Sequence, residues 1–204
     1  MITIIDYGCG NLGSIQNMIK KIGGKAQITS DVAQIAAAEK LILPGVGAFD
    51  TGIHNLHERG IWDILNKKVL ENKTPILGIC LGMQLMTNCS EEGKLKGLSW
   101  VDAETKRFDF ENYPLKRKVP NMGWNYITIL KESSLFKNMY DFPKFYFVHS
   151  YFVKCNNSED VLATAEYGFT YDCSFEKGNI FGVQFHPEKS HKYGMKLLEN
   201  FMKV

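Results

Sequence analysis

The kind of fold that this chain adopts is indicated by one predicted strand and the turn that follows it, Thr74-Pro75-Ile76-Leu77-Gly78-Ile79-Cys80-Leu81-Gly82. The apolar run predicts a buried strand, and a cysteine then stands between two glycines. This is the pattern of a nucleophile elbow, a sharp strand-to-helix turn that lifts a reactive side chain above a sheet. We expect a Cβ at either glycine to crowd the turn, and we expect strained backbone angles there. Cysteine in place of the usual serine predicts a thiolate nucleophile.

Around this turn, the first half of the chain alternates short apolar runs with helical patterns. Strands are expected at residues 2–5, 25–29, 41–43 and 74–80, and helices at residues 14–22, 32–38, 50–71 and 81–88. Asp31 is the expected N-cap of the second helix, Pro44-Gly45 ends the third strand, and Gly60 interrupts the third helical stretch. Strands that alternate with helices favour βαβ units and a parallel sheet.

The second half of the chain has a different character. Residues 100–129 and 144–184 are rich in Val, Ile, Phe, Tyr and Thr, which predicts antiparallel strands. A last helix is expected at residues 191–202. The predicted fold is therefore α/β, with a central, mostly parallel sheet flanked by helices and an antiparallel extension. We expect one domain, residues 1–204, because no linker or repeat suggests a second one.

Composition argues against several classes of protein. A net charge of +2 over 204 residues gives no support for a nucleic-acid partner or a polybasic membrane surface. The cysteines form no CxxC pair and their number is odd, so neither a disulfide framework nor a zinc ribbon is indicated; they are Cys9, Cys80, Cys89, Cys155 and Cys173. No signal peptide or membrane span is expected, which favours the cytoplasm. We expect no metal and no organic cofactor.

A cysteine nucleophile needs a base or a cation beside it to form a thiolate near neutral pH. His186 is the best candidate, because an apolar strand delivers it in the segment Gly182-Val-Gln-Phe-His-Pro-Glu188. If the extended chain continues through Pro187, His186 and Glu188 project to the same side. A carboxylate there fixes the tautomer of the imidazole and stabilises its charged form. The sequence thus predicts a Cys–His–Glu triad.

An acyl-transfer site also needs donors for the oxyanion that forms on the substrate. The backbone N–H of Leu81 starts the helix behind Cys80, and the segment Pro44-Gly-Val-Gly47 follows a neighbouring strand. Glycines in that segment leave its peptides free to turn toward a substrate. These two segments are the candidates for an oxyanion hole.

Together, these motifs resemble those of the class I, or triad-type, glutamine amidotransferases. The matching segments are Gly78-Ile-Cys-Leu-Gly-Met-Gln84, Pro44-Gly-Val-Gly-Ala-Phe49 and Gly182-Val-Gln-Phe-His-Pro-Glu188. Further segments resemble the glutaminase subunits of imidazole glycerol phosphate synthases: Asp6-Tyr-Gly-Cys-Gly-Asn-Leu-Gly13, Pro120-Asn-Met-Gly-Trp-Asn125 and Phe145-Tyr-Phe-Val-His-Ser-Tyr151. The resemblance covers essentially the whole chain.

The resemblance implies a role for each matching residue. The nucleophile would be Cys80, and His186 and Glu188 would complete the triad. The oxyanion hole would consist of Val46, Gly47 and Leu81. The glutamine head group would be held by Gln84, Glu92, His149, Ser150 and Tyr151. The residues that face a partner subunit would be Asn11, Asn121, Trp124, Tyr146 and Lys189.

The implied reaction is the hydrolysis of glutamine to glutamate and ammonia. Members of this family pass the ammonia through a tunnel to a (β/α)8 synthase, or cyclase, subunit of a heterodimer. That partner makes imidazole glycerol phosphate and AICAR in histidine biosynthesis. No second active site is evident in this chain, which fits a subunit that only makes ammonia.

The chain departs from the family pattern in two places. Asn121 stands where the family usually has histidine, and residues 97–104 lack an expected Pro-Gly turn. A related branch of the family supplies ammonia to enzymes that amidinate the sugars of surface polysaccharides, so that pathway remains an alternative.

Two interpretations of other classes compete with a glutaminase. Gly8-Cys-Gly-Asn-Leu-Gly13 fits the G-x-G-x-x-G pattern of a dinucleotide site, with Asp31 near the position of a ribose-binding acid. The pattern is short, and Asp6 and Tyr7 interrupt the usual apolar approach to its first glycine. A non-catalytic scaffold on the same fold is the other alternative, and the intact Cys, His and Glu set argues against it.

Overall fold

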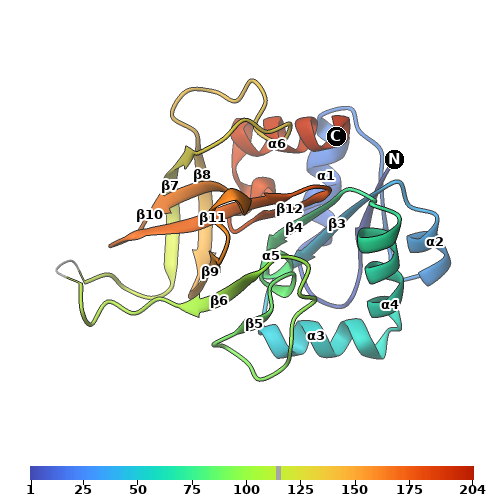
Figure 1. The fold of residues 1–204 in the computed structure, drawn as a ribbon. Helices are drawn as coiled ribbons and strands as arrows, with labels where there is room; N and C mark the ends of the chain where they lie inside the picture. The colour runs from blue at the N-terminus through green and yellow to red at the C-terminus, as the bar shows by residue number, and fades with distance from the viewer. Residues whose placement is uncertain (114–115) are drawn as a thin grey trace.

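A computed structural model describes residues 1–113 and 116–204, and one mixed sheet runs through them (Figure 1). The strands are β1 (Ile2–Ile5), β2 (Ala26–Thr29), β3 (Lys40–Gly45), β4 (Ile76–Cys80), β5 (Cys89–Ser90), β6 (Ala103–Arg107), β7 (Asn121–Ile129), β8 (Lys144–His149), β9 (Tyr151–Cys155), β10 (Val161–Glu166), β11 (Thr170–Lys177) and β12 (Ile180–Val183). The helices are α1 (Leu12–Lys21), α2 (Val32–Ala36), α3 (Phe49–Glu58), α4 (Ile61–Asn66), α5 (Leu81–Leu85) and α6 (His191–Lys203). A π-helical turn, Lys67–Glu71, extends α4, and 3-10 turns lie at Ser158–Asp160 and Pro187–Lys189.

The sheet has a parallel half and an antiparallel half. Its main order is β2-β1-β3-β4-β12-β11-β10-β7-β8, and every pairing from β2 to β12 is parallel. From β12 to β8 each pairing is antiparallel, and β9 and β6 pair antiparallel beside this path. The expected α/β fold with an antiparallel extension is confirmed. The last strand differs from the expectation, because β12 returns to lie parallel to β4.

Helices cover both faces of the parallel half because its strands are apolar on both sides. Ile2 and Ile4 of β1 pack with α1 and α6, whereas Ile5 packs in the second cluster with α2, α3, α4 and α5. Figure 1 shows α1 and α6 together on one face and α2, α3 and α4 on the other. The carboxyl ends of the parallel strands form the edge at which α/β proteins hold their ligands.

Most of the expected elements are present with small shifts at their ends. Asp31 caps α2 by accepting a hydrogen bond from the Gln34 N–H at 2.9 Å, as expected. Gly60 separates α3 from α4 in a left-handed conformation, with φ of 65°. Because Asp31 serves this capping role, it is already engaged in the fold and lends no support to a ribose site.

Two boundaries differ from the expectation. Pro44 and Gly45 belong to β3 instead of ending it, because pairing with β1 stops at Ile42 and a proline is tolerated where a strand has one neighbour. Helix α5 is shorter than expected and ends at Leu85. The Thr87 hydroxyl donates to the Gln84 carbonyl at 2.7 Å, and the Asn88 N–H donates to the Ala103 carbonyl, so the chain leaves the helix to join β6.

The elbow between β4 and α5 depends on space at its two glycines. A Cβ at Gly82 would lie 1.7 Å from the carbonyl oxygen of Leu43, and one at Gly78 would lie 2.8 Å from the Met83 nitrogen. The expected crowding is therefore present. The expected unusual angles are at Cys80 instead of at the glycines, since Cys80 has φ of 55° and ψ of −111°.

Among the residues that the structure describes, no helix is both long enough and apolar enough to span a bilayer.

The close approach at Gly82 predicts a large effect of one added methyl group. Gly82→Ala forces the α5 backbone away from β3, so we expect a loss of about 3 kcal/mol or more. For a chain of this size that corresponds to a fall in melting temperature of about 6–12 °C, measured by thermal unfolding. Gly13→Ala is the control, because nothing in the described chain lies within 4 Å of a Cβ there. Equal melting temperatures for the two variants would contradict this account of the elbow.

Candidate active site

Cys80 opens into a cavity of about 410 Å³ at the carboxyl edge of the parallel strands. Its side chain is buried, and its backbone lies in a left-handed region that non-glycine residues rarely adopt. Strain of this kind concentrates at functional sites. The cavity is lined by Val46, Gly47, Cys80, Leu81, Gln84, Glu92, Pro120, Val148, His149, Ser150, Tyr151 and His186. Every residue that the sequence assigned to the oxyanion hole or to the substrate thus lines the cavity of Cys80.

His186 and Glu188 form a buried pair beside this cavity. The Nδ1 atom of His186 lies 2.7 Å from Oε1 of Glu188, and each side chain is 3% exposed. The extended geometry expected through Pro187 is not observed, because Pro187–Lys189 is a 3-10 turn. The turn still brings the carboxylate back onto the imidazole.

Electrostatics hold His186 in its charged form. Burial lowers the pKa of His186, but the interactions with Cys80 and with Glu188 outweigh burial and raise this pKa to about 10. The sulfur acts on the imidazole at close range, yet Nε2 of His186 is buried and has no hydrogen bond of good geometry to any described residue. The proton on Nε2 therefore lies near Cys80 and makes no hydrogen bond of good geometry within the described residues, so it is available for transfer.

The oxyanion candidates come from two neighbouring strands. Leu81 follows Cys80 as the first residue of α5, and β3 leads directly into Val46 and Gly47. Gly47 has φ of 114°, a conformation that favours glycine, and no described atom lies within 4 Å of the position of a Cβ there. The left-handed φ explains why glycine suits this position, and the expected rotational freedom of its peptide stays a prediction.

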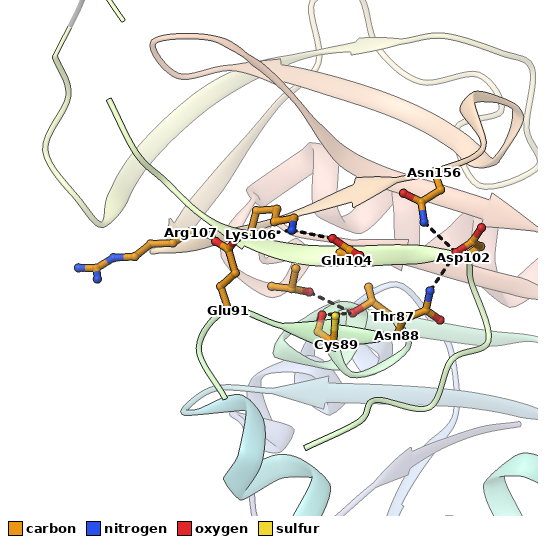
Figure 2. Close-up of polar contacts among 10 residues, drawn as sticks. Thr87, Asn88, Cys89, Glu91, Asp102, Glu104, Lys106, Arg107 and Asn156 are labelled. Carbon is orange, nitrogen blue, oxygen red and sulfur yellow. Dashed lines mark hydrogen bonds and ion pairs between the residues drawn. The ribbon is translucent and has the colours of Figure 1, made fainter. Parts of the chain in front are cut away.

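Glu92 reaches the cavity from the segment between β5 and β6. Its Oε2 accepts a hydrogen bond from the Phe49 N–H at 2.8 Å, which satisfies a free N–H at the start of α3. The preceding residue anchors the segment, because Oε2 of Glu91 accepts from the Arg107 N–H at 2.7 Å and Oε1 lies 3.5 Å from Nζ of Lys106. Figure 2 shows Glu91 between these two residues of β6.

Asp102, at the end of the segment between β5 and β6, makes further hydrogen bonds. Oδ1 of Asp102 accepts hydrogen bonds from the side-chain amides of Asn88 at 2.9 Å and Asn156 at 2.8 Å (Figure 2). Inside the fold, the hydroxyls of Thr87 and Thr105 are 3.1 Å apart. These contacts connect the residues that follow α5 with β6 and with Asp102, the residue directly before β6.

His149 is held in the opposite charge state from His186. Its Nδ1 donates to the Tyr151 carbonyl at 2.6 Å, and its Nε2 lies 3.1 Å from Nδ2 of Asn121. Burial lowers the pKa of His149 to about 4, against the effect of the Tyr151 carbonyl. The imidazole is therefore neutral near pH 7, with a proton on Nδ1 and an acceptor at Nε2.

The residues predicted to face a partner separate into two groups. Trp124 is 42% exposed, its ring lies 6.2 Å from that of Tyr146, and Nζ of Lys189 lies 5.7 Å from the centre of the Tyr146 ring. Asn11 is exposed at the N-cap of α1. Asn121 differs, because it is only 3% exposed and its amide serves His149 and Tyr171 inside the protein.

Sequence reasoning missed two polar residues next to the nucleophile. Gln184 is fully buried, and its Nε2 lies 3.7 Å from Sγ of Cys80. It could have been found, since alternation along a strand places it on the same side as His186. The Tyr7 hydroxyl is buried without a partner among the described residues, and burial, with Cys9 and Cys80 nearby, raises the pKa of Tyr7. Nothing in the sequence pattern pointed to Tyr7.

Known proteins match this chain over nearly its whole length. It is 57% identical to the imidazole glycerol phosphate synthase subunit HisH 2 of Methanococcus maripaludis, over 100% of this chain and 99% of the relative. It is 43% identical to the HisH subunit of Leptospira borgpetersenii, over 98% of both chains, and 43% identical to the HisH 2 subunit of Pseudomonas aeruginosa, over 100% of both.

Solved structures share the fold at low sequence identity. A crystal structure of a glutamine amidotransferase superposes with a TM-score of 0.75 at 18% identity, covering 100% of this chain and 98% of that chain. A chain in the structure of PurLQS from Thermotoga maritima superposes with a TM-score of 0.73 at 15% identity, covering 99% and 97%. The family model described as glutamine amidotransferase class-I matches residues 3–204. With the elbow cysteine, the buried histidine–glutamate pair and these matches together, the chain belongs to the class I glutamine amidotransferases.

Proposed function

We propose that this chain is the glutaminase subunit of an imidazole glycerol phosphate synthase in histidine biosynthesis. It hydrolyses glutamine to glutamate and ammonia, and the ammonia passes to a (β/α)8 synthase subunit in a heterodimer. The names of relatives at 43–57% identity support the assignment to this enzyme. The observation that carries the chemistry is the buried His186–Glu188 pair at 2.7 Å beside a strained cysteine.

The first half of the reaction forms a thioester. The Cys80 thiolate attacks the carbonyl carbon of the glutamine side-chain amide, and negative charge moves to the amide oxygen. The backbone N–H groups of Leu81 and of the Val46-Gly47 segment donate hydrogen bonds to that oxygen and stabilise its charge. His186 then gives its Nε2 proton to the nitrogen as the carbon–nitrogen bond breaks, which releases ammonia.

The second half consumes water. His186, now neutral, takes a proton from a water molecule that attacks the thioester carbonyl. The carbon–sulfur bond breaks to give the Cys80 thiolate and the side-chain carboxylic acid of the product, which loses its proton to solvent to become glutamate. Glu188 accepts from Nδ1 throughout, so the imidazole keeps one orientation in both of its protonation states. The charged imidazole that results restores the starting state.

The substrate groups have matching partners in the cavity. Glu92 carries the only carboxylate among the described residues of the lining, and that charge suits the α-ammonium group of glutamine. Both N–H groups of the Gln84 amide are used within the protein, which leaves its Oε1 for the ligand. The segment His149-Ser150-Tyr151 also lines the cavity.

The synthase partner docks, in this proposal, on the aromatic face beside the cavity. β7 and β8 border both regions, since Val148 of β8 and Pro120, directly before β7, line the cavity, while Trp124 is exposed and Tyr146 is partly exposed. Exposed aromatic side chains of this kind are enriched at protein interfaces. Because the cavity and the aromatic face lie next to each other, ammonia released in the cavity would travel only a short distance to the partner.

A second candidate differs only in the acceptor of the ammonia. Asn121 departs from the histidine usual in the family, and the related branch that serves polysaccharide-amidinating enzymes has the same glutaminase chemistry. Glutamine-dependent formation of imidazole glycerol phosphate by the complex supports the first candidate, and transfer to a sugar acceptor supports the second.

Removal of the nucleophile gives the most direct test. Cys80→Ala should abolish glutaminase activity of the complex and leave the melting temperature within about 5 °C, because one small side chain is lost. A diazo analogue of glutamine should label Cys80 alone. Cys89→Ala, which alters an exposed cysteine, should retain activity. Labelling at any cysteine other than Cys80 would reject the assignment.

The charge on His186 predicts a pH dependence. Because the pKa of His186 is raised to about 10, its proton is present below that pH, and kcat/KM should fall as pH rises through about 10. Any folding stability from this charge is complete below about pH 6.5 and is lost as pH rises toward 10. Glu188→Gln removes one of the raising interactions, so its alkaline limb should move to lower pH.

The surface pair His54–Glu58 offers the matched control for Glu188. Nε2 of His54 lies 3.0 Å from Oε1 of Glu58, and both side chains are 63% exposed. Glu58→Gln should therefore leave the alkaline limb in place. A limb that does not move in Glu188→Gln would show that the carboxylate does not hold the imidazole charged.

The docking face can be tested by binding. Lys189→Ala removes a cation that lies over the Tyr146 ring, so we expect the dissociation constant for the synthase subunit to rise about tenfold, measured by calorimetry. Lys25→Ala is the control, because it changes the same charge at the opposite edge of the sheet. Equal affinities for the two variants would place the partner elsewhere.

A further inference from the structure

The side-chain amide of Gln184 is fully buried, and both its oxygen and its nitrogen make hydrogen bonds. It follows β12 between the buried side chains of Val183 and Phe185. Its Oε1 accepts a hydrogen bond from Nε2 of Gln84 at 3.0 Å, and its Nε2 donates to Sγ of Cys80 at 3.7 Å. Burying an amide costs free energy unless its polar atoms are paired, so the two contacts account for its presence in an apolar setting.

The orientation of both amides follows from a backbone group. The Tyr151 carbonyl can only accept, so the Gln84 atom 3.2 Å from it is the nitrogen. That nitrogen also faces Gln184, so the Gln184 atom opposite it is the oxygen. The remaining end of Gln184, which faces the sulfur, is therefore its N–H donor.

The same contacts extend to the rim of the sheet. The Tyr151 carbonyl that accepts from Gln84 also accepts from Nδ1 of His149, and Nε2 of His149 meets the Asn121 amide. Hydrogen bonds therefore connect β7, at one side of the cavity, with the nucleophile on the elbow. Gln184 is the last member of this series before Cys80.

We propose that Gln184 is a positioning residue for glutamine hydrolysis, which orients the Cys80 sulfur through its amide N–H and sets the Gln84 head through its amide oxygen. This inference rests on the proposed glutaminase function. A donor aimed at the sulfur favours its anionic form. By accepting from Nε2 of Gln84, Gln184 also leaves Oε1 of Gln84 facing the cavity. One residue therefore positions both the nucleophile and a substrate-binding group.

Two variants separate the two ends of the amide. Gln184→Glu has the same shape and keeps an oxygen opposite Gln84, but it replaces the N–H donor that faces Cys80. Gln184→Met has a similar volume and removes both contacts. Ser174→Ala is the control, because it removes a buried hydrogen bond to the Gly182 carbonyl on the neighbouring strand without touching Cys80.

The principal measurement is the pH profile of Cys80 alkylation by iodoacetamide in the full chain, followed on the peptide that contains Cys80. In Gln184→Met and Gln184→Glu we expect the midpoint to rise by about one pH unit, which is about a tenfold slower reaction at neutral pH. Glutaminase assays of the complex should show a lower kcat in both variants. The KM for glutamine should rise in Gln184→Met and stay near wild type in Gln184→Glu.

An unchanged alkylation midpoint in folded Gln184→Met overturns the inference, and so does an equal shift in Ser174→Ala. If Gln184→Met melts below the assay temperature, Gln184→Glu is judged by the same criterion. Alkylation requires no turnover, so it reports on Gln184 independently of the proposed function. The proposed function fails separately, if the wild-type complex does not hydrolyse glutamine.

Discussion

The rest of the site depends on the left-handed backbone at Cys80. Angles of this kind cost about 1–3 kcal/mol and persist only where the surroundings enforce them. Here the packing of α5 holds Cys80 in these angles. The helix is too short to be stable alone, and all five of its residues are buried. Gly82 lets this helix lie directly on the Leu43 carbonyl. The sulfur is therefore raised above the sheet by the same contacts that build the core.

The two histidines of the cavity show how surroundings divide chemical roles. Burial lowers the pKa of both side chains, but only His186 has a carboxylate and a sulfur close enough, among the described residues, to reverse that effect. His186 is therefore charged, with a proton to transfer, whereas His149 is neutral and donates to the Tyr151 carbonyl at the edge of the cavity. Neighbouring titratable groups whose pKa values are pushed apart mark the acid–base assignments of a site.

The candidate catalytic and substrate-binding groups lie where the two halves of the sheet meet. The parallel half supplies Cys80 and the oxyanion candidates, and the antiparallel half supplies His149 and Tyr151. β12 belongs to both, because it pairs parallel with β4 and antiparallel with β11. That double pairing delivers His186 to a cysteine far away in sequence. The parallel direction of the first four strands was predictable from the alternation of strands and helices. The order of the strands and the return of β12 to β4 were not, because the sequence of a short apolar strand does not specify its pairing partner.

Local patterns in the chain were enough to predict the elbow and the α/β class, because tight turns and strand periodicity restrict residue types directly. They also pointed to His186 and Glu188, although the chain brings these two side chains together through a 3-10 turn and not through the extended geometry expected from the sequence. The three-dimensional fold alone decided that Asn121 is buried against His149 and that the amide of Gln184 contacts the sulfur of Cys80. Those contacts join residues from separate strands, and their strength comes from burial and distance. Neither quantity exists until the sheet has assembled.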